Sequence, residues 1–287
     1  MLWLALSLLS ALAQSSRDLL SKSELQELDE YILAFSRNFF SLSLLIPLLF
    51  ITGIPEVGFY FWLVTGVNSI LFSAASVLYM RAIKLSPLSL TVPMLAFTPL
   101  FLLLTSPLIV GEFPNYPGLI GILFIVSGTY VLSIKDVKKG YLAPFKALGE
   151  EKGALVMLVV AVLFSLGANL FKIGIQQTSP LYFLTMFYVL NSGITFLLIL
   201  TQPRTFKTGS KINLKVLLGI GVFNALMEIF VATAMQTAIV PYVISLKRTT
   251  ILLSTFYGYL FFKEERIKER LTGALTMFLG ILLIGLS

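Results

Sequence analysis

Ten stretches of mainly apolar residues follow one another along the chain, separated by short polar connections. A helix that crosses the hydrocarbon core of a bilayer needs about 20 such residues, and each stretch is close to this length. The sequence therefore predicts an all-α integral membrane protein with ten transmembrane helices. The predicted spans are 1–21, 30–52, 58–81, 87–110, 116–134, 153–176, 180–201, 213–236, 239–262 and 268–287.

The composition indicates that lipid is the solvent for most of the chain. Of the 287 residues, 57% are hydrophobic and 12% are charged, whereas a soluble domain carries about 25% charged residues. The chain has neither Cys nor His, which excludes disulfides, thiolate chemistry and metal sites built on these residues. Because no acidic metal cluster replaces them, we expect no metal, no cofactor and no enzymatic activity.

The two halves of the chain resemble each other at a nearly constant offset. A shift of 150 places residues 10–22 over 160–172, and a shift of 152 places 111–128 over 263–280. The coincident pairs are Ala11 with Ala161, Ser15 with Ser165, Lys22 with Lys172, Glu112 with Glu264, Gly121 with Gly273 and Gly128 with Gly280. Five spans per repeat is an odd number, so the second copy enters the membrane from the opposite side, as in many secondary transporters. We predict two inverted five-helix repeats over 1–134 and 153–287, joined by a linker over 135–152 that contains a short interfacial helix.

Basic residues are confined to alternate connections. The connections after the odd-numbered spans carry sixteen Lys and Arg, and the other connections and both termini carry none. The positive-inside rule then places the odd-numbered loops in the cytoplasm and both termini outside the cell membrane (plasma or inner). This distribution also argues against nucleic acid as the partner, despite the net charge of +7. The first span ends like a signal peptide but lacks a basic region before it, so we expect it to be retained as a helix.

Charged residues inside the predicted spans each need a reason, because a charge at the bilayer centre costs about 2.5–3.5 kcal/mol. Lys247 and Arg248 lie near the middle of the ninth span, too deep to reach either surface easily, and Glu228 lies at a similar depth in the eighth. Glu228 is either a fixed partner of one of these cations or a group that binds substrate or carries a proton. Two cations for one carboxylate leave a positive surplus, which favours substrate contact by Lys247 or Arg248.

Arg37, Asp18, Arg17 and Lys172 are the remaining charged residues within the spans. Arg37 either lines a pore or pairs with Asp18, and Asp18 is the second candidate for proton coupling. Arg17 and Lys172 lie near span ends, so we expect both to extend toward the membrane surface.

Neutral polar residues and prolines add further candidates. Asn169 and Asn224 share the second half with Lys247, and we expect both to contact substrate. Pro93, Pro99 and Pro241 fall in the fourth and ninth spans, where interior prolines bend helices and line transporter sites. Three further candidates for lining a cavity are Tyr79, Tyr188 and Tyr257.

These features resemble a known family. The runs SPLSLTVPMLAFTPLFLLLTSPLIVGE (86–112) and VPYVISLKRTTILLSTFYGYLFFKEE (240–265), each followed by a glycine-spaced last helix, look like EamA-type permeases of the drug/metabolite transporter superfamily. AFSRNFF resembles the family's Ala-x-x-Arg position in its second helix. The resemblance covers both repeats and implies ten helices, a central cavity and alternating access. Lys247 and Arg248 also resemble the Lys-Arg pair with which related triose-phosphate translocators hold phosphate, although the matching first-repeat positions are Leu95 and Ala96.

Two functions follow as hypotheses. The first is a secondary transporter that moves a small anionic or zwitterionic metabolite by alternating access between the repeats, without direct use of ATP because no Walker A motif occurs. The second is an exporter of hydrophobic or cationic drug-like compounds, which predicts a net acidic interior. The spans carry five cations and two anions, which favours the first. The expected partners are a small-molecule substrate and membrane lipid, in a monomer or homodimer.

Overall fold

The computed structural model describes residues 1–24, 30–86, 92–133, 151–201, 213–253 and 267–287. Within these ranges the chain forms helices and their connections, and it contains no strand. The first half comprises α1 (Leu2–Glu24), α2 (Glu30–Thr52), α3 (Phe59–Leu85), the 3₁₀ helix η1 (Val92–Phe97), α5 (Thr98–Ile109) and α6 (Tyr116–Ser133). The second half comprises α8 (Lys152–Gln176), α9 (Pro180–Leu200), α10 (Leu214–Thr237), α11 (Val240–Lys247) and α13 (Ile267–Gly285).

The helix bounds follow the predicted spans to within about five residues, except in the ninth span, where α11 ends at Lys247. Helices α2, α3, α8, α9 and α10 are long and apolar enough to cross a membrane, and shorter apolar helices cover Met94–Ile109, Tyr116–Leu132 and Thr272–Gly285. The predicted all-helical, multi-pass membrane fold is thus confirmed, and the number of ten spans stays a prediction. Most of the linker 135–152, with its predicted interfacial helix, and the candidate Tyr257 lie outside the described residues.

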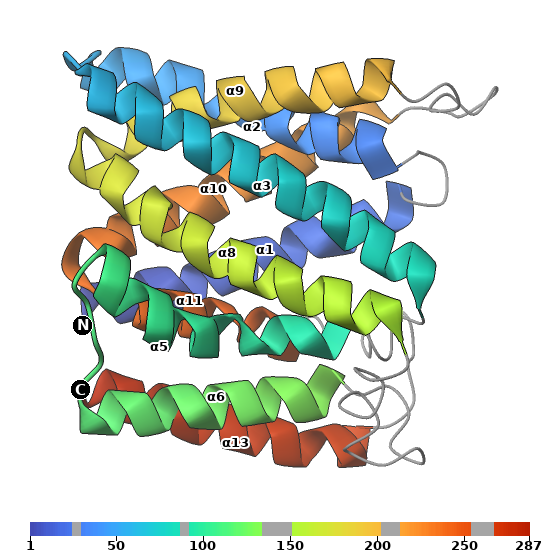
Figure 1. Ribbon diagram of the computed structural model, residues 1–287, viewed down its shortest axis with the longest axis vertical. Helices are drawn as coiled ribbons and strands as arrows, with labels where there is room; N and C mark the ends of the chain where they lie inside the picture. The colour runs from blue at the N-terminus through green and yellow to red at the C-terminus, as the bar shows by residue number, and fades with distance from the viewer. Residues whose placement is uncertain (25–29, 87–91, 134–150, 202–212, 254–266) are drawn as a thin grey trace.

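Helix packing repeats itself between the two halves. Helix α1 packs on α10 as α8 packs on α3, and α11 packs on α1 as α5 packs on α8. Helices α2 and α9 occupy equivalent positions in the two halves, as do α6 and α13. The two helices of each pair pack on each other and so join the halves directly. In Figure 1 the α6–α13 pair lies at one side of the bundle and the α2–α9 pair at the other. This pattern is what a pseudo-two-fold axis between two inverted repeats requires.

The α6–α13 pair depends on four glycines that the repeat comparison had matched. A Cβ on Gly121 would lie 2.8 Å from the carbonyl oxygen of Gly280, and a Cβ on Gly128 would lie 2.6 Å from that of Gly273. Without these side chains the two backbones come into direct contact, as small residues allow in membrane helices. The partner numbers run in opposite directions, so the two helices are antiparallel.

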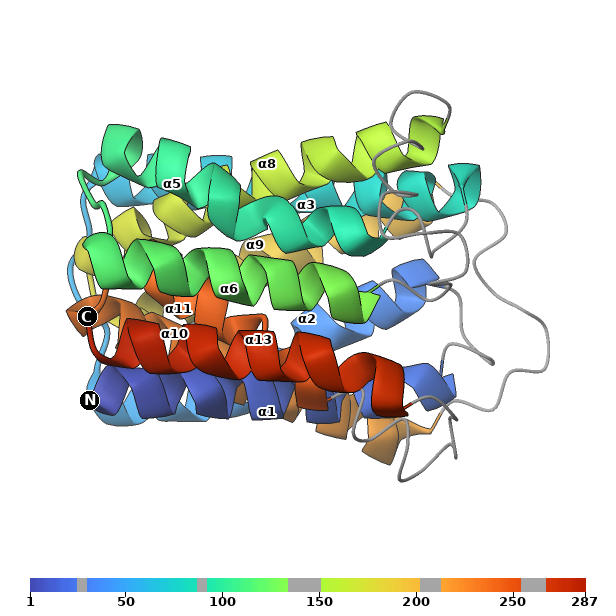
Figure 2. The ribbon, with the colours of Figure 1, turned by 90° about the horizontal axis from the view of Figure 1, so that it is seen from below.

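Both chain termini lie at one end of the bundle, where α5 leads into α6 and α10 into α11 (Figures 1 and 2). We call this the terminal end. At the opposite end, the described basic residues Arg81, Lys152 and Lys215 are exposed. The terminal end carries the exposed carboxylate Glu56 instead.

The prolines occupy different positions from those expected. Pro99 and Pro241 lie in the first turns of α5 and α11, where the backbone N–H has no intrahelical acceptor and a proline interrupts no hydrogen bond. Pro93 is the second residue of η1, and the geometry changes from 3₁₀ to α where η1 ends and α5 begins, at Thr98. The expectation that Pro241 bends a helix interior is therefore wrong, because α11 only begins there.

Candidate functional site

Six charged side chains gather between the two repeats, and we call them the central charge cluster. Each lies within electrostatic range of at least one other member. Tyr79 lies within the same range of Arg17, Asp18 and Arg248. The members are Arg17 and Asp18 on α1, Arg37 on α2, Glu228 on α10, Lys247 at the end of α11 and Arg248 directly after it.

Arg17 points into the bundle, with 13% of its side chain exposed. Its Nε and Nη2 donate to Oδ1 of Asp18 at 2.9 and 2.6 Å. Its Nη1 donates to Oδ1 of Asn224 at 2.9 Å and approaches the sulfur of Met227 at 3.6 Å. Our expectation that Arg17 extends to the membrane surface is therefore wrong, because oxygen acceptors within the bundle satisfy the guanidinium first.

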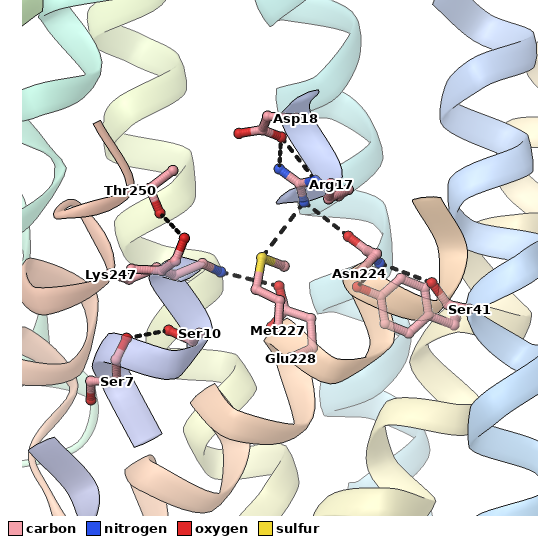
Figure 3. Close-up of polar contacts among 12 residues, drawn as sticks. Ser7, Ser10, Arg17, Asp18, Ser41, Asn224, Met227, Glu228, Lys247 and Thr250 are labelled. Atoms are coloured by element: carbon pink, nitrogen blue, oxygen red, sulfur yellow. Dashed lines mark hydrogen bonds and ion pairs between the residues drawn. The ribbon is translucent and has the colours of Figure 1, made fainter. Parts of the chain in front are cut away.

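Asn224 connects this arginine to the helices around it (Figure 3). Its side chain is buried, and its Nδ2 donates to Oγ of Ser41 at 2.9 Å and to the hydroxyl of Tyr188 at 2.8 Å. Ser41 in turn donates to the carbonyl of Gly221 at 3.1 Å, which fixes α2 against α10. Asn224 thus holds α1, α2 and α9 to α10, and it orients Arg17. Ser41 was not a sequence candidate, since a serine in an apolar span carries no distinguishing signal.

Lys247 and Glu228 form an ion pair at 3.1 Å, with 19% and 15% of their side chains exposed. Helix α11 ends at this lysine, Arg248 and Thr249 form a turn, and helical geometry resumes at Thr250. The α-helical geometry of the ninth span is therefore interrupted beside the charge cluster, where i→i−3 hydrogen bonds carry the backbone through the turn. The partially negative carboxyl end of α11 favours the cations placed there. Of the two alternatives for Glu228, the structure shows the ion pair with Lys247.

Arg37 and Arg248 have no carboxylate partner among the described residues. The Nε atom of each is buried without a hydrogen-bond partner in the described part of the chain. The guanidinium carbon of Arg37 lies 6.0 Å from the ring centroid of Phe72. Asp18, which the sequence offered as a partner of Arg37, is bonded by Arg17 instead. Four cations and two carboxylates give the cluster a surplus of two positive charges.

Asn169 lies apart from this cluster. It is fully buried between α8 and α5, where its Oδ1 accepts from Ser106 at 2.7 Å and its Nδ2 donates to Thr105 at 2.9 Å and to the carbonyl of Ser165 at 3.0 Å. Every part of the amide is therefore engaged within the protein. This geometry is that of a residue that holds two helices together.

Lys172 is also placed differently from the expectation. Its side chain is 6% exposed, forms an ion pair with Glu112 and donates to the carbonyl of Ala238 at 2.9 Å. The lysine therefore does not extend to the membrane surface, because acceptors in the neighbouring connections are closer.

Comparisons with known proteins identify the family and the fold. A model of the EamA-like transporter family matches residues 1–134 and 151–286. A solved structure titled "Crystal structure of protein" has a TM-score of 0.77 and 18% sequence identity, and the match covers 99% of this chain and 96% of that chain. This likeness shows a shared fold. A search of curated proteins found no match. With both repeats matched by the family model, the chain belongs to the EamA-like transporter family, whose members are membrane transporters of the drug/metabolite transporter superfamily.

Proposed function

We propose that this protein is a secondary transporter that moves a small anionic or zwitterionic metabolite by alternating access between its two repeats. The central charge cluster is the proposed binding site. The observation that carries the proposal is the surplus of two cations, Arg37 and Arg248, whose buried Nε atoms have no hydrogen-bond partner among the residues that the structure describes. Buried guanidinium donors are costly to leave unsatisfied, and an anionic oxygen is the acceptor that satisfies them best.

The ion pair of Lys247 and Glu228 supports a coupling step at the same site. A bound anion competes with the Glu228 carboxylate for Lys247, and the released carboxylate then takes up a proton. Asp18 is the second candidate for this role, since 42% of its side chain is exposed. Substrate exchange without protons uses the same site with Glu228 remaining ionised.

The discontinuity of the ninth span supports movement next to the site. Ends of broken helices line the substrate sites of many transporters near the membrane midplane. Here the break in α-helical geometry at Arg248 and Thr249 lies directly after Lys247, so that Lys247 and Arg248 are both placed at the repeat interface. We propose that this break, with the η1–α5 junction at Pro93 and Pro99, serves as the hinge, and that Pro241 sets the start of the moving segment.

The topology is part of the proposal. The exposed basic residues Arg81, Lys152 and Lys215 support a cytoplasmic location for the end opposite the termini. Both termini then lie outside, with ten spans divided into repeats 1–134 and 153–287 by the linker 135–152. The protein is placed in the plasma or inner membrane, as a monomer or homodimer.

Export of cationic or hydrophobic compounds is the second candidate function. The exposed part of the Asp18 carboxylate favours it, because this group is available to bind a cation. The net charge of the cluster opposes it.

Thermal stability of the purified protein against a compound library separates the two. A ligand at one hundred times its dissociation constant stabilises the folded state by about 2.7 kcal/mol. The variants are Arg248→Gln and Lys247→Gln, with the exposed cation of Lys215→Gln as the matched control. We expect phosphorylated or carboxylated compounds to stabilise the wild type and the control but not the site variants. Stabilisation by cationic compounds alone, or an equal response of all variants, would rule out the anion site.

A further inference from the structure

A compact polar contact joins the two repeats at the terminal end, away from the charge cluster. Glu112, in the connection between α5 and α6 of the first repeat, forms an ion pair with Lys172 of α8 in the second. The second carboxylate oxygen of Glu112 accepts from the backbone N–H of Val240 at 2.8 Å. Lys172 also donates to the carbonyl of Ala238 at 2.9 Å. One carboxylate therefore binds the start of α11 and the end of α8 together.

Local backbone geometry places Glu112 at this point. Helix α5 ends at Ile109, and two residues later Gly111 adopts φ of +78° and its N–H donates to the carbonyl of Ser106 at 2.9 Å. A left-handed residue at this position suits glycine, and it turns the chain sharply out of the helix. The next residue is Glu112, whose carboxylate reaches the first turn of α11. There it accepts one of the N–H groups that a helix start leaves without an intrahelical partner.

The largest hydrophobic core lies directly beneath this contact. It includes the end of α8, the start of α9 and the start of α11, with Phe171 and Phe183 in edge-to-face contact at 5.0 Å between ring centroids. Met235 and Val243, from the end of α10 and the start of α11, are at most 1% exposed. Among the described residues, buried apolar side chains therefore pack beneath the terminal end, whereas members of the charge cluster keep partial exposure.

We infer that Glu112 and Lys172 form a latch that holds the terminal end closed and that must break for this end to open. The inference rests on the proposed alternating access. The contact spans both repeats, so the repeats cannot separate at this end while it persists. Its members are 15% and 6% exposed, so water competes little for the charges. The latch holds the start of helix α11, and Lys247 lies at the other end of the same helix. Release of the helix start is therefore coupled to the position of Lys247.

The absence of Cys from the sequence gives a direct test, because one introduced thiol is the only one in the chain. Ser245 is fully buried on α11 between the latch and Lys247, about 7.5 Å along the helix from Val240. In the variant Ser245→Cys, the rate of modification by a water-soluble maleimide reports opening. A second reporter, Ala75→Cys on α3, is equally buried in a different core cluster and reports general loosening.

The latch variants are Glu112→Gln and Lys172→Met. Glutamine keeps an acceptor for Val240 and removes only the charge, so this variant retains the cap on α11. Glu56→Gln is the matched control, because it makes the same change at an exposed position of the same end. We expect both latch variants to accelerate labelling at position 245 by about tenfold, which corresponds to about 1.4 kcal/mol. Labelling at position 75 and in the control stays at the wild-type rate.

Wild-type labelling rates at position 245 in both latch variants would overturn the latch, as would equal acceleration at position 75. If either variant fails to fold, the other gives the same comparison. No substrate enters the experiment, so its outcome is independent of the anion screen. Accelerated labelling with no anionic ligand found would retain the latch and remove the proposed substrate class.

Discussion

Removal of either partner of the central ion pair is predicted to have unequal consequences. Glu228 lies within electrostatic range of Arg17 and Arg37 as well as Lys247, so three cations share its charge. Lys247 is attracted by Glu228 alone among these neighbours and is repelled by Arg17 and Arg248. We therefore expect Glu228→Gln to destabilise the protein considerably more than Lys247→Met.

The magnitude follows from the 3.1 Å separation of the pair. Two unit charges at about this distance attract by about 5 kcal/mol at an effective dielectric constant of about 20. Desolvation offsets much of this attraction, and loss of one partner of a buried pair costs about 3–5 kcal/mol. Because Glu228 and Lys247 are partly exposed, we expect about 3 kcal/mol for Glu228→Gln. Relief of repulsion lowers the expected cost of Lys247→Met to about 1 kcal/mol on the same scale.

Equilibrium unfolding in mixed micelles, followed by intrinsic fluorescence, measures the difference. The double variant Glu228→Gln/Lys247→Met completes a double-mutant cycle. It should be more stable than Glu228→Gln alone, since it leaves one fewer unmatched cation. Equal costs for the two single variants, or a double variant less stable than both, would refute the proposed charge imbalance of the cluster.

Three further predictions concern packing and hydrogen bonding. Gly280→Ala should destabilise the protein by about 1–3 kcal/mol, because its Cβ would lie 2.6 Å from a backbone oxygen of α6. The control Gly66→Ala, with open space around its Cβ, should leave stability unchanged. The unfolding midpoints of the two variants measure the difference. Asn169→Leu should cost about 1 kcal/mol, at about 0.6 kcal/mol for each of its two interhelical bonds, yet leave ligand affinity in a binding titration unchanged. Arg17→Lys should keep the contact with Asp18 but lose the bond to Asn224, which lowers stability by about 1 kcal/mol in the same unfolding assay. A changed affinity in Asn169→Leu would mean that this residue belongs to the site.

Hydropathy alone located the helices well, because lipid imposes the same length and polarity on every span. The matched glycines of the two halves also predicted the repeat, since the α6–α13 contact requires small residues in both copies. The orientations of Arg17 and Lys172 could not be predicted in this way. Their partners Asn224 and Ala238 lie far away in sequence, and only the fold brings these acceptors closer than the membrane surface.

The sequence also could not separate the two asparagines. Asn169 and Asn224 have similar apolar surroundings along the chain, and they differ only in what neighbouring helices present to them. Asn169 faces the hydroxyls of α5, whereas Asn224 faces Arg17. For Pro241, the predicted start of the span at 239 was within one residue of the observed start of α11 at Val240. The expected bend was wrong because a proline this close to a helix start lies in the first turn, where it interrupts no hydrogen bond.

Counterflow of a radiolabelled anion from the stability screen, in liposomes that contain the purified protein, tests the central claim most directly. Wild type and Lys215→Gln should exchange the anion at the same rate, while Arg248→Gln should lose at least about 90% of the flux, as loss of about 1.4 kcal/mol of binding at subsaturating substrate implies. The variant must keep the wild-type elution profile and unfolding midpoint. Undiminished anion flux in a folded Arg248→Gln protein would contradict a transport site built on the central charge cluster.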